Sequence, residues 1–273
     1  MLKPGVQTTV QDIGRYGYSH FGISSSGPAD EFSFRLGNII LGNDEKLASL
    51  EMTLMGGDFQ FNSDTEIAIT GSRFNISLDG KHIDYNLPIL VKKNQVLSIG
   101  MTEEGARCYL SIKGGVKTQN YLNSKTTHVM AGMGGLLGRP LKKGDILEIG
   151  KNNGVNSIDI PNNIDKINRS IILINRGLQS SYFSDSTWDS FTSKMFIASE
   201  VFSRMGIRLT GNPIYSSKGN EILTEGIPIG AIQVPGGGEP IISFVEHQTT
   251  GGYPKIANVI SADLCKVGQL KPG

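Results

Sequence analysis

Long hydrophobic runs are missing from this chain of 273 residues, of which 38% are apolar. No stretch approaches the roughly 20 consecutive apolar residues that a membrane-spanning helix needs. Residues 1–9 also lack an apolar segment of signal-peptide length. We therefore expect a cytoplasmic protein that is not embedded in a membrane. The apolar content still suffices for a sizeable core, in one large domain or two ordinary ones.

Charge of one sign, cysteine and clustered histidine are scarce as well. The 26 basic residues nearly cancel the 25 acidic ones, so nothing indicates a nucleic acid or an anionic membrane as partner, and a small ligand suits this balance better. The four histidines are scattered, and no metal site is predicted. Cys108 and Cys265 fit no metal or redox spacing, and we predict that both are buried thiols.

Phosphate-binding and nucleophile motifs are missing too. The glycine cluster at 132–138 places its third glycine one residue too late for a dinucleotide-binding fingerprint, and no cluster continues into Gly-Lys-Ser/Thr. The stretch at 22–27 does not satisfy the Gly-x-Ser-x-Gly elbow. Any contact with ATP would therefore be made by other means or on another chain.

Glycine is abundant, with 35 residues, whereas aromatic residues make up 7%. Glycine supplies the conformations of tight turns, and many turns join short strands. Alternating apolar and polar residues from Glu51 onward predict a meander of antiparallel strands, with Asp79-Gly80 as a hairpin turn. The sequence therefore predicts a mainly β fold with a few short helices.

The clearest helix is expected near 28–42, because Pro28 suits a first helical position and Asp30 and Glu31 oppose the helix dipole. Its apolar face would contain Phe32, Leu36, Ile39 and Ile40. A shorter helix is expected to begin at Asp44 and to carry Leu47 and Leu50.

The segment 151–168 is polar and rich in asparagine, as is typical of a linker. After it, the apolar run 171–174 predicts a buried strand. Residues 184–196 predict a helix capped by Ser184 or Asp185, with an apolar side formed by Trp188, Phe191 and Met195. We therefore predict an N-terminal β-rich module over 1–155 and a C-terminal β module over 165–273.

Two stretches combine polar side chains with glycines in the manner of ligand-binding loops. The first is 8–17, with Gln11, Asp12 and Arg15, and it precedes the predicted helix that carries Asp30 and Asn38. Amides, carboxylates and guanidinium groups bind planar amides or carboxylates through paired hydrogen bonds. The alternative is that Asp12 and Arg15 pair with each other and only brace the loop, and chemistry alone does not choose between the two.

The second stretch is 244–254, where a strand-like run is followed by polar side chains and then by Gly251 and Gly252. Adjacent glycines allow backbone amides to approach a ligand oxygen closely. Upstream, Gln233 lies at the end of a predicted strand before the glycine-rich loop 236–238. The alternative is a capped turn without a ligand, because Gly-Gly and Tyr-Pro also form ordinary turns.

These stretches resemble the KipA family, also known as the C subunit of 5-oxoprolinase, which is similar to the second half of biotin-dependent urea carboxyltransferase and to allophanate hydrolase subunit 2. The longest matching motifs are Thr9-Val-Gln-Asp-Ile-Gly-Arg15 and Gln248-Thr-Thr-Gly-Gly-Tyr-Pro254. The other matching positions follow in the expected order along the chain: 26–30, 42–43, 50–53, 68–71, 204–206, 226 and 230–235. The resemblance thus spans nearly the whole chain.

The resemblance implies two β-barrel-like modules with a cyclophilin-like part. It implies ATP-dependent opening of 5-oxoproline to glutamate, with ATP and Mg²⁺ used in a complex that also contains a KipI-like B subunit plus an A subunit. The catalytic residues that it implies are Asp12, Arg15, Asp30, Glu246 and Gln248. The implied substrate-binding residues are Gln11, Asn38, Gln233, Thr249, Thr250, Gly251, Gly252 and Tyr253.

The chain departs from the family pattern at three places. Glu246 and Ser203 stand where the family commonly has Asp, and the sequence stops at Gly273, before the family's final turn and strand, so that the C-terminal strand is expected to be truncated. Two alternative functions stay open. One is a carboxyltransferase that uses carboxybiotin, or an allophanate-hydrolase-associated subunit. The other is a KipA-type regulator that binds a KipI-like kinase inhibitor.

Overall fold

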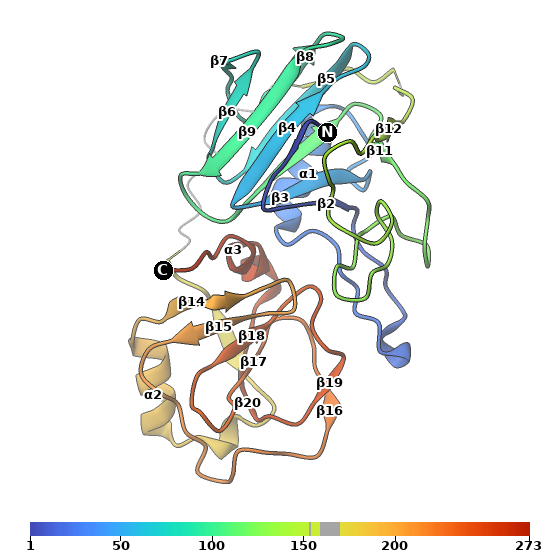
Figure 1. Cartoon of the computed structure of the whole chain (residues 1–273). Helices are drawn as coiled ribbons and strands as arrows, with labels where there is room; N and C mark the ends of the chain where they lie inside the picture. Colours follow the sequence, from blue (N-terminus) through green and yellow to red (C-terminus); the bar gives the residue numbers. More distant parts are fainter. Residues whose placement is uncertain (153, 159–169) are drawn as a thin grey trace. The chain divides into compact units, whose positions relative to one another are not determined.

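The computed structural model describes residues 1–152, 154–158 and 170–273 (Figure 1). The chain divides into two compact units. The first unit consists of Met1–Arg15 and Ser26–Asn168, and the second of Tyr16–Ser25 and Arg169–Gly273. Residues 16–25, which the sequence analysis placed in the N-terminal module, thus group with the second unit. Most of the predicted linker lies outside the described residues.

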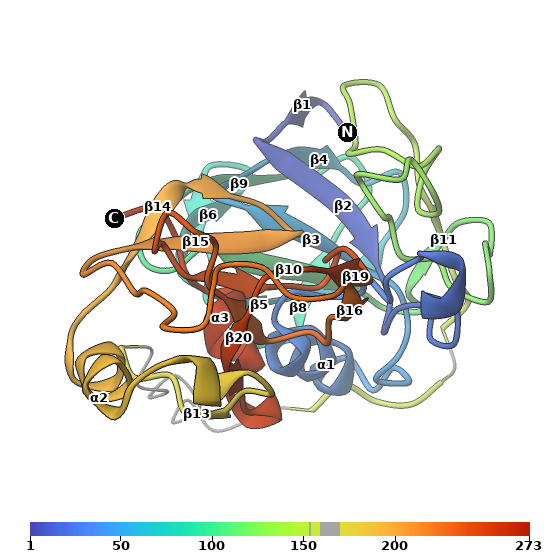
Figure 2. The same ribbon diagram turned by 90° about the horizontal axis from the view of Figure 1, so that it is seen from below.

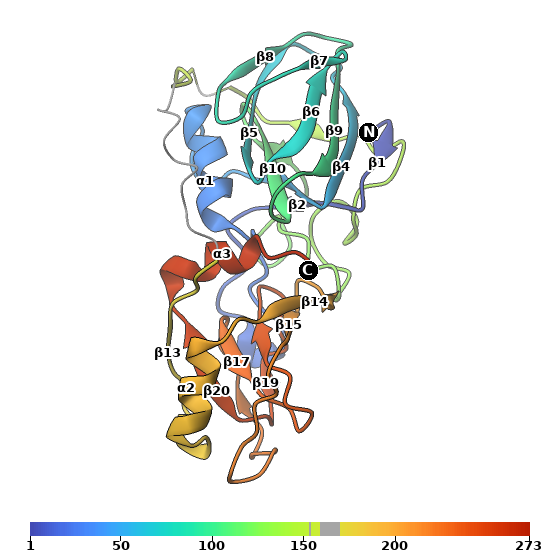
Figure 3. The ribbon, with the colours of Figure 1, turned by 90° about the vertical axis from the view of Figure 1, so that its left-hand side faces the viewer.

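The first unit contains two five-stranded antiparallel sheets, whose strands wrap around a shared interior in Figure 3. One sheet has the order β1-β4-β9-β6-β7 and the other β2-β3-β10-β5-β8. The strands in chain order are β1 (Lys3–Pro4), β2 (Gln7–Gln11), β3 (Ser49–Thr53), β4 (Met55–Gln60), β5 (Thr65–Gly71), β6 (Phe74–Leu78), β7 (Lys81–His82), β8 (Ile89–Val91), β9 (Val96–Thr102) and β10 (Arg107–Ile112). A two-stranded sheet joins β11 (Val116–Lys117) to β12 (Glu148–Ile149).

Apolar residues at every second position build the core of this unit. Ile67 and Ile69 of β5, like Leu97 and Ile99 of β9, are buried in one cluster. The period of two places such residues on one face of a strand. The predicted hairpin turn is confirmed between β6 and β7, where Asp79 (φ 48°) and Gly80 (φ 78°) both adopt the left-handed conformation that a two-residue turn requires.

Helix α1 (Glu31–Ile40) packs against β5 and β10, and its first turn is capped by Asp30, which accepts a hydrogen bond from the Ser33 amide (3.0 Å). The predicted start at Pro28 was therefore too early, because the capping carboxylate sets the boundary. The predicted apolar face was partly wrong: Phe32 and Ile39 are exposed, whereas Phe34 is buried edge-on against Tyr109. The predicted helix over 44–50 was wrong, since β3 begins at Ser49.

The second unit is built on a six-stranded antiparallel sheet with the order β13-β20-β17-β18-β15-β14. Its strands are β13 (Ile174–Arg176), β14 (Ile197–Phe202), β15 (Gly206–Thr210), β17 (Ala231–Gln233), β18 (Ile241–Ser243) and β20 (Lys255–Val259). A smaller sheet pairs β16 (Glu225–Gly226) with β19 (Thr250–Gly251). The helices are α2 (Asp185–Ser193) and α3 (Leu264–Gly268). The mainly β fold that the sequence predicts is confirmed.

Helix α2 lies beside β13 (Figures 2 and 3), where the Arg176 guanidinium stacks 4.4 Å from the centre of the Trp188 ring. Its capping by Ser184 is confirmed, but Met195 is 87% exposed. The run 171–174 is not a buried strand, since Ile171 and Leu173 are exposed and β13 begins at Ile174. Cys108 is buried as predicted, whereas the prediction was wrong for Cys265, which is partly exposed.

Removing a core side chain of the first unit should destabilise it strongly. Leu97 is fully buried in the apolar cluster, and Leu→Ala at such positions costs about 2–5 kcal/mol. We expect L97A to lower the denaturant midpoint measured by circular dichroism. The matched control is L90A on β8, whose side chain is exposed, with an expected effect within about 0.5 kcal/mol. Equal losses in both variants would contradict this assignment of the core.

Candidate functional site

In the first unit, Asp12 holds the loop at 124–125 against the end of β2. Its Oδ1 accepts hydrogen bonds from the Gly14 amide (3.0 Å) and the Ser124 hydroxyl (2.6 Å), and its Oδ2 accepts one from the Lys125 amide (2.6 Å). Three donors thus hold this carboxylate in place. The geometry therefore gives Asp12 the bracing role that the sequence left open, with residues of a distant loop as its partners.

Gln11 and Arg15 secure the next residues of the same loop. The buried guanidinium of Arg15 donates from Nη2 to the Thr126 carbonyl (2.5 Å). The Gln11 side chain donates to the Thr127 carbonyl (3.2 Å), and its amide oxygen accepts from the Thr126 hydroxyl. The motif at 9–15 thus positions the loop at 124–127, a contact between segments far apart in sequence.

Asp30 and Asn38, on the following helix, also make contacts within the fold. Asp30 accepts from both the amide and the hydroxyl of Ser33 (3.0 and 2.7 Å). Asn38 is completely buried, and its side chain donates to the Leu47 carbonyl (2.7 Å) and accepts from Asn43 (3.1 Å). These contacts fix the start of α1 and the loop that follows it.

A buried carboxylate that the sequence analysis did not select lies beside them. Glu51 accepts hydrogen bonds from the Ala29 amide (2.8 Å) and the Tyr109 hydroxyl (2.7 Å), and Nε of Arg107 lies 3.7 Å from its other oxygen. Burial raises the pKa of Tyr109 well above its ordinary value, with the Glu51 charge as the next cause. A charged residue inside the apolar run Leu50–Met52 was the signal that could have revealed it.

In the second unit, two glutamine side chains and a glycine come together. Gln233 is 4% exposed, and its Nε2 makes no hydrogen bond within the described part of the chain. A methyl group added at Gly251 would lie 3.2 Å from Nε2 of Gln233 and 3.3 Å from Nε2 of Gln248. The structure thus brings together three of the residues selected from sequence, Gln233, Gln248 and Gly251, which we call the glutamine cluster. In it, side-chain amide donors lie next to a glycine, where no side chain covers the backbone.

Glu246 points into the interior of the same unit. Its Oε1 accepts a hydrogen bond from Nε of Arg204 at 2.5 Å, and both side chains are buried. The Glu246 amide also donates to the Arg204 carbonyl (2.8 Å). This pair joins two motifs of the family pattern, and it holds the start of the Gln248–Pro254 stretch.

The remaining predicted residues lie around the small β16/β19 sheet. The carbonyls of Thr249 and Gly252 accept from the amides of Ile227 (3.0 Å) and Ile222 (2.8 Å). The side chains of Thr250 and Tyr253 are exposed. These residues therefore flank the glutamine cluster at the surface of the unit.

Lys255, which the sequence analysis missed, lies next to this cluster. It is the register partner of Gln233 across β17 and β20, it is 1% exposed, and its ammonium forms an ion pair with Glu225. The amide group of Gln179 donates to the same carboxylate (2.8 Å). The hydrogen bond from Lys255 and then that from Gln179 hold the pKa of Glu225 below its ordinary value. A lysine at the first position of a strand, directly after Pro254, was the available signal.

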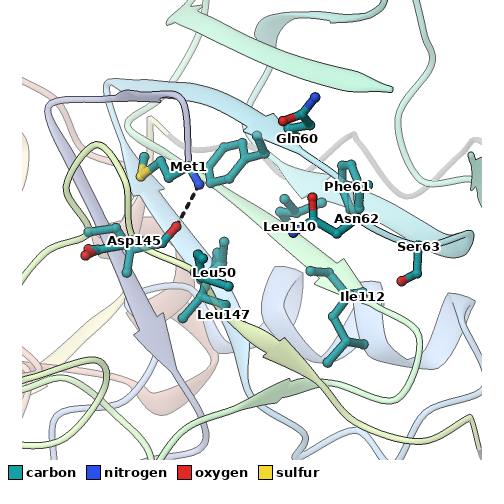
Figure 4. A pocket seen from close by; sticks show the side chains of 14 residues that line it. Met1, Leu50, Gln60, Phe61, Asn62, Ser63, Leu110, Ile112, Asp145 and Leu147 are labelled. Carbon is teal, nitrogen blue, oxygen red and sulfur yellow. Dashed lines mark hydrogen bonds between the residues drawn. The ribbon is translucent and has the colours of Figure 1, made fainter. Parts of the chain in front are cut away.

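A separate cavity of about 260 Å³ opens in the first unit (Figure 4). Its floor is apolar and includes Leu50, Leu110 and Ile112, and polar residues such as Gln60 and Asn62 line it as well. The nitrogen of Met1 donates to the Asp145 carbonyl at 2.8 Å on one side. None of the residues selected from sequence lines this cavity.

Two absences hold for residues 1–152, 154–158 and 170–273, the part of the chain that the structure describes. No three His, Cys, Asp or Glu side chains gather there in a way that could hold a metal ion. No helix in that part of the chain is long and apolar enough to cross a membrane.

Comparison with solved structures defines the class of fold. The chain superposes over its whole length on the crystal structures of Kluyveromyces lactis urea amidolyase (TM-score 0.92, 32% identity) and urea carboxylase (TM-score 0.91, 33% identity). It covers 18% and 26% of those chains, respectively. This is the two-unit β fold of a carboxyltransferase-type domain. Residues 21–273 match the sequence profile described as carboxyltransferase domain, subdomain A and B, and the chain belongs to that family.

Two bacterial relatives are covered over most of their length. The chain is 34% identical to the C subunit of 5-oxoprolinase from Escherichia coli over 280 residues, which is 100% of this chain and 88% of that protein. It is also 34% identical to the corresponding 5-oxoprolinase chain of Haemophilus influenzae, over 98% of this chain and 86% of that protein. Urea amidolyase of Saccharomyces cerevisiae is 36% identical over 99% of this chain, but only 16% of that protein is covered. The resemblance inferred from the motifs is confirmed.

The buried pair of Arg204 and Glu246 should matter more for stability than an exposed pair. Removing one partner leaves an uncompensated buried charge, at a cost of about 3–5 kcal/mol. We expect R204M to lose that much in urea unfolding followed by fluorescence of Trp188, the single tryptophan of the chain. The control R208M breaks the more exposed pair with Glu239, which should cost less than about 1 kcal/mol. Similar losses in the two variants would rule out a special role for the buried pair.

Protonation of His247 should destabilise the second unit. Burial lowers the pKa of His247, even though its Nδ1 contacts the Gln248 carbonyl (2.8 Å). As the pH falls, His247 is therefore protonated in the unfolded chain before it is protonated in the folded protein. The stability that neutral His247 contributes is complete above its unfolded-state pKa of about 6.5. It is lost as the pH falls toward the folded-state pKa.

The measurement is the free energy of unfolding, followed by the fluorescence of Trp188. We expect it to fall less between pH 7.5 and 5.5 in H247Q than in the unsubstituted protein. The control H82Q changes an exposed histidine of the first unit and should leave the loss unaltered. An identical pH dependence in H247Q would contradict the assignment.

Proposed function

We propose that this chain is the C subunit of an ATP-dependent 5-oxoprolinase, which works with an A and a KipI-like B subunit to convert 5-oxoproline to glutamate. The near-complete match to two proteins named as C subunits of 5-oxoprolinase supports this proposal. The structural observation that carries it is the cluster of Gln233, Gln248 and Gly251. Its amide donors suit the acceptor oxygens of a small cyclic amide.

The chemistry of the substrate explains why such donors are useful. An unstrained lactam resists water at neutral pH. In the proposed reaction the γ-phosphoryl group of ATP, with Mg²⁺, is transferred to the lactam oxygen, and ADP leaves. Water then attacks the activated carbon, the ring C–N bond breaks, and phosphate and glutamate are released. Positioning and charge stabilisation supply most of such catalysis.

The side chains of this chain would divide these tasks. Gln233 and Gln248 would touch the substrate, with the amides of Gly251 and Gly252 beside them. Glu246 is paired with Arg204, so we assign it a positioning role. Asp12, Arg15 and Asp30 make the loop and helix contacts described above, and we assign them positioning roles in the first unit.

A second candidate is carboxyl transfer to a urea-like amide, with carboxybiotin carried on another polypeptide. The family match and the TM-score of 0.92 to a urea amidolyase favour it. This candidate also uses an amide substrate, so the glutamine cluster suits both. A KipA-type regulator that binds a KipI-like inhibitor would need only a partner surface, and it gives these glutamines no role.

The decisive assay is glutamate release from 5-oxoproline and ATP by this protein with its cognate A and B subunits, omitting each chain in turn. We expect release from the complete set and none when this chain is left out. A correctly assembled complex that releases no glutamate, but carboxylates urea in the presence of carboxybiotin, would establish the second candidate instead.

A further inference from the structure

Two strand pairs of the second unit place a buried ammonium beside the glutamine cluster. Gln233 and Lys255 are register partners across β17 and β20, so their side chains lie on the same face of that sheet. Glu225 and Gly251 are register partners across β16 and β19. The Lys255–Glu225 ion pair and the approach of Gly251 to Gln233 connect the two pairs. Four residues from four strands therefore form one polar group.

This group holds more buried donors than acceptors. An ammonium carries three N–H donors and a primary amide two. Lys255 is 1% exposed, and the described residues offer its Nζ one acceptor, the Glu225 carboxylate, which leaves its other N–H groups without one there. Nε2 of Gln233 is buried without a hydrogen-bond partner in the same part of the chain. Buried donors without acceptors are costly, and proteins keep them mainly where a ligand or water completes them.

The acceptor that faces Lys255 is itself poorly buried. The Glu225 side chain is 36% exposed and belongs to a strand of two residues. Water can solvate this carboxylate when it leaves, but the buried ammonium would then lack a counter-ion, so Glu225 is displaced only when another anion takes its place. An incoming anion could then take its position without a net change of charge around Lys255.

We infer that Lys255 and Gln233 form a carboxylate-binding subsite, in which the carboxylate of Glu225 occupies the ammonium until a substrate carboxylate replaces it. A planar carboxylate offers one oxygen to Nζ of Lys255 and the other to Nε2 of Gln233. A doubly charged phosphate would leave one charge uncompensated beside a single ammonium. The inference rests on the proposed function in one respect: it identifies the bound group as the carboxylate of 5-oxoproline.

The subsite would make this chain selective between closely related amides. 5-Oxoproline carries the carboxylate, whereas 2-pyrrolidinone, the same lactam ring without it, and urea do not. A ligand without a carboxylate does not displace Glu225 from the ammonium and leaves the buried amide of Gln233 unpaired, so it gains no binding energy from this subsite. Lys255 and Gln233 are therefore specificity-determining residues.

The test measures binding of 5-oxoproline and of 2-pyrrolidinone to the full chain by ligand-observed NMR. We expect K255M and Q233L to weaken binding of 5-oxoproline, K255M by about tenfold or more, with little effect on 2-pyrrolidinone. E225Q removes the competing carboxylate and should tighten binding of 5-oxoproline several-fold. The matched control is K194M, which changes an exposed lysine at the end of α2 and should leave both affinities unaltered.

The opposite signs of K255M and E225Q keep the test decisive even if K255M loses stability, which thermal unfolding would reveal. The inference fails if the unsubstituted chain does not bind 5-oxoproline, if it binds 2-pyrrolidinone as well as 5-oxoproline, or if E225Q weakens binding.

Glutamate release by the complete complex separates the inference from the proposed function. If complexes with E225Q or K255M release glutamate with an unchanged KM for 5-oxoproline, the subsite is refuted, but the proposed function still holds. Binding of 5-oxoproline that depends on Lys255, in a complex that releases no glutamate, would support the subsite and sink the proposed reaction.

Discussion

A charge that is buried in a β protein must be met by donors or by an opposite charge, and this constraint shapes both units. Glu51 shows it most clearly, because its carboxylate accepts hydrogen bonds from the Ala29 amide and the Tyr109 hydroxyl and pairs with the nearby Arg107 guanidinium. These partners come from two separate segments, the loop before α1 and strand β10. The loop before α1 is therefore fixed to β3 and β10 by the solvation demand of one carboxylate. In the second unit, Glu246 and Arg204 meet the same demand.

The same constraint explains why so many residues of the family motifs have contacts within the fold. Asp12, Arg15 and Asp30 hold loops and a helix end through hydrogen bonds of 2.6, 2.5 and 3.0 Å, respectively. A loop with many glycines has little packing to hold it, since glycine adds no side chain and much conformational freedom. Polar braces supply that order. A motif residue can thus be indispensable for a site without touching a ligand.

The sequence predicted the elements whose signals are local. The turn at Asp79-Gly80 and the cap at Ser184 depend on a few neighbouring residues, and both are present. The face of α1 was predicted only in part, because 32–40 contains apolar residues on more than one side and Tyr109, distant in sequence, selects Phe34. Gln233, Gln248 and Gly251 were selected from their motifs. Lys255 and Glu51 were missed, since only strand register shows what faces each of them.

Lys255 and Arg204 are both buried, but their counter-ions differ in how far they are exposed to water. Arg204 is matched by a carboxylate as buried as itself, which is the arrangement of a permanent brace. Lys255 is matched by Glu225, a carboxylate that water reaches. A buried ammonium needs an acceptor beside it, so the position tolerates exchange of one carboxylate for another but not its loss. Permanent pairing thus suits structure, and exchangeable pairing suits recognition of an anion.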